Sequence, residues 1–95
     1  MVIAYAVFDM HLPGCQGLKE KRMIVKSLKS RLKNEFEVSA AEVGGQDLLQ
    51  RAQIGVAAVG PDQAPLDALL QHIHRFVEQN LDGELLEVHN EFIHV

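Results

Sequence analysis

The chain has 95 residues, 47% hydrophobic and 23% charged, so it has the composition of an ordinary globular protein and is too short for two domains. Its net charge of −4 hides an asymmetry: residues 19–33 carry seven cations and one anion, and the remainder carries two cations and twelve anions. This distribution excludes a general attraction to polyanions but allows a local one. We therefore expect a single domain over residues 1–95.

Cysteine content and hydropathy indicate the cellular compartment of the protein. Cys15 is the only cysteine, so no intrachain disulfide can form and a reducing compartment is favoured. The longest apolar run, residues 1–8, is far shorter than the ~20 residues of a membrane span. No basic segment precedes it, as one would in a signal peptide. We predict a cytoplasmic protein without membrane contact.

The N-terminal half predicts a strand, a turn and a helix. Residues 2–8 are apolar at both alternating sets of positions, which is typical of a central strand buried on both faces. Residues 11–17 are rich in glycine and proline and predict a turn. A helix is predicted over residues 18–34. We expect Gly17 as its N-cap and Glu20 accepting a hydrogen bond from the cap's backbone N–H.

The C-terminal half predicts two strands, a helix and a last strand. Residues 36–43 begin with apolar and polar positions in alternation, as in a strand with one wet face, whereas residues 53–59 lack charge and predict a second central strand. Their short connection favours an antiparallel hairpin. A helix with one apolar face is predicted from the N-cap Asp62 to Val77. Residues 86–92 alternate and predict an edge strand.

The order β-α-β-β-α-β predicts an α+β, ferredoxin-like sandwich. Its antiparallel sheet would have strand order 4-1-3-2, with both helices on one face. The other face would then have no cover, although its central strands are apolar. Because bare apolar patches usually meet a partner, we predict a homo-oligomer formed through the sheet or its edges.

The predicted first helix carries a one-sided set of cations. Five of them recur at intervals of three and four residues and would form a row roughly 21 Å long within an arc of roughly 80°. Like-charge neighbours at this spacing cost about 0.2–0.5 kcal/mol each, so an anionic counterpart is expected. Phosphates are one candidate, and the twelve acids outside this segment are the other. This basic row consists of Lys19, Arg22, Lys26, Lys29 and Lys33.

Other constellations give weaker signals. Base stacking on the sheet is disfavoured, because residues 53–59 contain no aromatic side chain, and Tyr5 and Phe8 are expected in the core. His72 and His74 would lie about 160° apart around a helix, which is unsuited to a shared metal. Cys15 has no catalytic signature around it. We therefore predict no metal, no cofactor and no enzymatic activity.

Three segments, LKEKRMIVKSLKSRLKNEF, VSAAEV and DLLQRAQIGVAAV, together resemble the bacterial YlxP-like family, a domain of unknown function. The resemblance covers nearly the whole chain. It implies a small ferredoxin-like protein without an established activity, from genes often near those of transcription elongation and ribosome maturation factors. The chain departs from the family in having Gly17 where serine is usual and Leu49 where tryptophan is usual.

These observations lead to one functional hypothesis and an alternative. The hypothesis is a non-enzymatic protein that binds RNA or a ribosomal particle through the basic row, with Lys21 and Arg51 as additional contacts. The alternative is a structural or protein-interaction module that self-associates through its open sheet face. In that case the basic row would pair with an acidic patch on its own or another chain.

Overall fold

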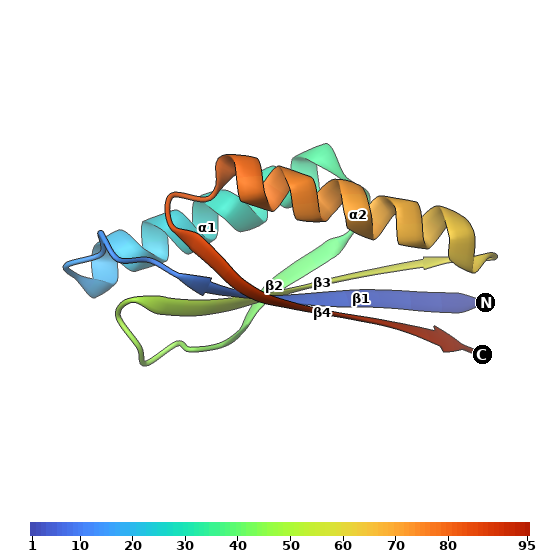
Figure 1. Ribbon diagram of the computed structural model, residues 1–95, viewed down its shortest axis with the longest axis horizontal. Coiled ribbons are helices and arrows are strands. Elements are labelled where there is room, and N and C mark those ends of the chain that lie inside the picture. The colour runs from blue at the N-terminus through green and yellow to red at the C-terminus, as the bar shows by residue number, and fades with distance from the viewer.

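Four strands and two helices follow one another in the predicted order (Figure 1). The structure, a computed structural model, describes all of residues 1–95. Its elements are β1 (Val2–His11), α1 (Leu18–Glu35), β2 (Ser39–Gly44), β3 (Arg51–Gly60), α2 (Gln63–Asn80) and β4 (Glu84–His94). The strands form one antiparallel sheet in the order β2-β3-β1-β4, which is the predicted order read from the other edge. The ferredoxin-like prediction is confirmed.

Both helices cover the same face of the sheet (Figure 1). α1 packs on the edge strand β2 and its neighbour β3, whereas α2 packs on β1, β3 and β4. The opposite face of the sheet, which we call the open face, has no helix over it. In the strand order β2-β3-β1-β4, β2 and β4 are the two edge strands, so the prediction of an edge position for the last strand is confirmed.

Alternation along β1 explains where the core lies. Its even-numbered residues, such as Phe8, are buried against the helices, and its odd-numbered residues are only partly covered. Phe8 pairs in register with Ile54 and Val88, so all three point to the same face. The central position of this strand is confirmed. Its predicted burial on both faces is wrong for the single chain, because nothing covers the open face.

Each helix buries one stripe, as its apolar periodicity requires. The predicted cap contacts differ in detail. Gly17 is the N-cap of α1, but Glu20 accepts a hydrogen bond from the backbone N–H of Gln16 at 3.3 Å, one residue earlier than expected. Asp62 is the N-cap of α2 without a side-chain cap hydrogen bond. The buried residues are Lys21, Val25, Leu28 and Leu32 in α1 and Leu66, Leu70, Ile73 and Val77 in α2.

The segment after α1 begins β2 later than predicted. Phe36 is the C-cap of α1, and its backbone N–H donates to Leu32 O at 2.9 Å. Its ring packs edge-on against Phe76 of α2, with centroids 5.5 Å apart. Phe36 therefore belongs to the contact between the helices, and the strand starts only at Ser39.

The open face keeps apolar side chains in contact with solvent. Val59 on β3 is 65% exposed, Val43 on β2 is 52% exposed and Ile93 on β4 is 45% exposed. Apolar residues at such exposure on one sheet face are typical of an association surface.

Candidate nucleic-acid interface

The position of the basic row follows from the orientation of α1. At about 100° per residue, the five cations centre about 110° from the buried stripe, on one flank of the helix. The other flank faces α2, where the Arg31 guanidinium donates to Asn80 Oδ1 at 2.5 Å and lies 5.7 Å from the centroid of the Phe76 ring. The basic row therefore lies on the side of α1 turned away from α2, above the edge strand β2.

The basic row is open to solvent and has no partner from its own chain. Four of its members are exposed and Lys29 is half-buried. Carboxylates instead lie within 4.0 Å of Lys21, of Arg51 and of the imidazole rings of His11, His74 and His89. No side-chain hydrogen bond involves the row either. The twelve acids outside residues 19–33 thus leave these five charges uncompensated.

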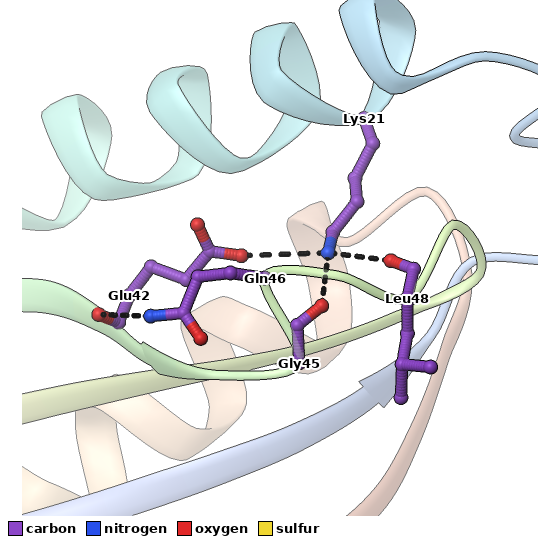
Figure 2. Close-up of polar contacts among 5 residues, drawn as sticks. All are labelled: Lys21, Glu42, Gly45, Gln46 and Leu48. Carbon is purple, nitrogen blue, oxygen red and sulfur yellow. Dashed lines mark hydrogen bonds and ion pairs between the residues drawn. The ribbon is translucent and has the colours of Figure 1, made fainter.

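Lys21 does not belong to this surface, which corrects the prediction that it contacts RNA. Its side chain is only 3% exposed and points between α1 and the β2–β3 loop (Figure 2). The ammonium donates to Gly45 O at 2.5 Å and to Leu48 O at 2.6 Å. It also lies 3.6 Å from Glu42 Oε2. A group with three oxygen neighbours and almost no exposure is unavailable to a phosphate.

The spacing of Lys21 from the apolar residues of α1 predicts its burial. Lys21, Val25, Leu28 and Leu32 follow the spacing i, i+4, i+7, i+11, which is that of one helix face. The charge of Lys21 suggests that it belongs with the basic row, but its angular position around the helix is that of a core residue. Its long apolar stem covers the core while its ammonium reaches the loop beyond it.

The loop that Lys21 holds is itself tightly built. Gly45 has φ +74°, the left-handed region that favours glycine, and a Cβ there would lie 3.1 Å from Arg51 O. The Gln46 side chain donates to Glu42 O at 3.5 Å (Figure 2). Glu42 Oε2 is buried and accepts no hydrogen bond, so its attraction to the ammonium is mainly electrostatic. Lys21 is thus a structural clamp between α1 and this loop.

Arg51 is also separated from the basic row. It begins β3 on the open face, and its guanidinium donates to Asp9 Oδ2 of β1 at 2.7 Å. The basic row lies in the helix layer on the other side of the sheet. Because it pairs with Asp9 and lies on a different face, Arg51 does not extend the row. The structure brings together the five members of the row and separates Lys21 and Arg51 from them.

The open face offers no platform for base stacking. Phe8 is buried in the core, as expected. Tyr5, also expected in the core, lies half-buried on the open face instead, where its hydroxyl donates to Glu91. Hydrogen bonding to this carboxylate raises the pKa of Tyr5, and the same bond lowers the pKa of Glu91. The neighbouring strand β3 carries no aromatic residue.

Sequence comparison assigns the chain to a protein family. Residues 3–90 match the family described as protein of unknown function (DUF503). The chain belongs to this family. It is 34% identical over 77 residues to the uncharacterized protein YlxP of Bacillus subtilis (strain 168), which corresponds to 81% of this chain and 84% of that protein. The resemblance inferred from the three sequence segments is thereby confirmed.

The remaining chemically active side chains of this DUF503 protein are scattered. No three histidine, cysteine or acidic side chains gather closely enough to hold one metal ion. His74 pairs with Glu78 at 3.2 Å within α2. Burial raises the pKa of the Cys15 thiol, and the carbonyl of Cys15 accepts a hydrogen bond from Gln50 at 3.2 Å. Neither helix is long and apolar enough to span a membrane.

Proposed function

We propose that this DUF503 protein is a non-enzymatic, cytoplasmic protein that docks on RNA or an RNA–protein particle through the basic row. The observation that carries the proposal is that five neighbouring cations on one flank of α1 make no ion pair, whereas Lys21 and Arg51 each have a carboxylate partner. Four like-charge neighbours along the row cost about 1–2 kcal/mol in total. A polyanion laid along α1 would remove this repulsion and release its own counterions.

The chemistry of the row favours backbone contact over base recognition. Four of its five members are lysines, whose ammonium groups act as point charges toward phosphate. Arg22 is the only planar guanidinium that could recognise a guanine edge with two hydrogen bonds. With no aromatic platform beside it, the row would fix the position of an RNA strand with little sequence preference.

The scaffold keeps the row straight. Near the start of α1 the buried Lys21 joins the helix to the β2–β3 loop, and near its end Arg31 joins it to Asn80. A rigid helix presents its cations in a fixed spacing, which reduces the entropy lost on binding.

The decisive experiment measures binding of a labelled single-stranded RNA by fluorescence anisotropy at several salt concentrations. If the row neutralises about five phosphates, affinity should fall roughly a hundredfold between 50 and 200 mM salt. The triple variant Arg22→Glu, Lys26→Glu and Lys29→Glu should lose binding and should no longer cosediment with ribosomal particles. The single variant Lys26→Glu has a matched control in Arg75→Glu, an exposed cation on α2 outside the row.

Two results would reject the proposal. One is equal RNA binding by the triple variant and the wild type at low salt. The other is row-dependent binding of polyglutamate without any binding of RNA of equal length, which would identify an acidic protein surface as the counterpart. Circular dichroism of each variant verifies that the charge changes leave the fold intact.

A further inference from the structure

In the middle of the open face, the β2–β3 half has small side chains and the β1–β4 half has large ones. Register places Ser39 and Ala41 of β2 beside Ala57 and Gly55 of β3. A shallow cavity of about 300 Å³ lies over these positions, with Gly55 and Ala57 in its floor and Tyr5 and Val7 of β1 along one side. In register with these positions, the β1 and β4 half carries the larger side chains Tyr5, Val7, His89 and Glu91.

Charge on the open face also differs between the two halves. At one end of the face, β3 presents Arg51 and Gln53, whereas β1 and β4 present Asp9 and Glu87 in the same part of the register. The other end is apolar, with Val59 paired to Ile3 and Ile3 paired to Ile93. The β2–β3 half therefore combines the shallow cavity with the cation Arg51, whereas the β1–β4 half combines larger side chains with the acids Asp9 and Glu87.

We infer that the open face binds a second copy of this chain, with a two-fold axis running along the strands. A two-fold interface uses the same patch on both copies, so the patch must complement itself. This axis places β3 of one copy over β1 of the other, and β2 over β4. The large side chains of each copy then enter the shallow cavity of its partner. Arg51, which pairs with Asp9 of its own chain, approaches the acidic half of the partner, where Glu87 has no ion-pair partner of its own.

Other arrangements of two copies are less favourable. An axis across the strands, centred on the face, sets the apolar end of one copy against the charged end of the other. Pairing of two β2 edges would bring the two basic rows side by side, with repulsion between like charges. Contact through the open faces instead directs the two rows to opposite outer surfaces of the dimer.

The size of the face meets the requirement of a specific interface. Strands of 10, 10, 11 and 6 residues form it. At ~3.3 Å per residue and ~4.8 Å between strands it covers about 600 Å² per copy. The two copies together would bury about 1,200 Å², which is at the lower end of specific protein interfaces. We therefore expect a dimer that dissociates on dilution.

Sedimentation equilibrium tests whether the dimer forms. The wild type should approach twice the chain mass of 10.6 kDa as concentration rises. Val59→Lys places a charge on a side chain that is 65% exposed in the single chain, and should raise the dissociation constant at least about 100-fold. The matched control is Met23→Lys on α1, where the side chain is 64% exposed, and it should leave the constant unchanged.

A complementary pair of variants tests the axis. Ala57 and Tyr5 are partners in register, so each faces the other's counterpart across the proposed axis. Ala57→Phe should block self-association by placing large against large. Mixed with Tyr5→Ala chains, it should form a heterodimer detectable by native mass spectrometry, because both contacts are again large against small. This rescue also shows that the Ala57→Phe chain is folded.

Three outcomes would overturn the inference. They are a wild type that stays monomeric at every concentration, a Val59→Lys variant that dimerises like the wild type, and a mixture of Ala57→Phe and Tyr5→Ala chains that yields no heterodimer. The result is independent of RNA binding, since none of these substitutions touches the basic row.

Discussion

The clamp formed by Lys21 leads to a quantitative prediction about stability. Lys21→Met keeps the length of the apolar stem and removes the ammonium, which leaves Gly45 O, Leu48 O and the Glu42 carboxylate without their common partner. Removing one member of a buried ion pair costs about 3–5 kcal/mol. The Glu42 side chain keeps 23% exposure, and water can reach part of it, so we expect a loss of about 3 kcal/mol.

Urea unfolding followed by circular dichroism measures this loss. The same substitution at an exposed position, Lys26→Met, is the control and should change the free energy of unfolding by less than about 0.5 kcal/mol. In a double-mutant cycle, Lys21→Met combined with Glu42→Leu should be less destabilising than the sum of the two single changes, by at least about 1 kcal/mol. Equal effects of Lys21→Met and Lys26→Met, or a coupling of zero, would refute the clamp.

Two further predictions concern the loop and the open face. Gly45→Ala should destabilise the protein by about 1–2 kcal/mol in urea unfolding, because its φ of +74° disfavours a side chain; a change near zero would contradict this. Tyr5→Phe should raise the pKa of Glu91 toward its ordinary value, measured by carboxyl-carbon NMR, because the Tyr5 hydroxyl lowers it. A lowered folded-state pKa means that the ionised Glu91 stabilises at neutral pH and that this contribution disappears as pH falls through that pKa. An unchanged Glu91 titration in Tyr5→Phe would argue against the hydrogen bond.

The order of elements and the topology were predictable because local patterns determine them. Charge-free segments identified the two central strands, and periods of three and four residues identified both helices. The start of β2 was missed because Phe36 lies against Phe76, a contact between segments 40 residues apart that no local pattern reveals. Tyr5 was misplaced for a related reason, since a central strand is buried on both faces only if both are covered.

The candidate site was predictable in its geometry but not in its electrostatics. Helical spacing alone places the five cations on one flank of α1. Whether acids elsewhere in the chain neutralise them depends on tertiary structure, which brings Asp9 to Arg51 and Glu42 to Lys21 and brings none to the row. For Lys21 the geometry was predictable but was not used. Its spacing from Val25, Leu28 and Leu32 assigns it to the buried face, although its charge alone predicts an exposed side chain.

The attachment of α1 at both ends bears on how a polyanion would meet it. Lys21 fixes one end to the sheet layer and Arg31 fixes the other to its neighbouring helix, so the spacing of the cations along α1 is fixed. A flexible single strand must straighten to match it and loses conformational freedom in doing so. A strand already held straight by base pairing or by a surrounding particle meets the same charges without that loss, so α1 should prefer RNA that is ordered before the encounter.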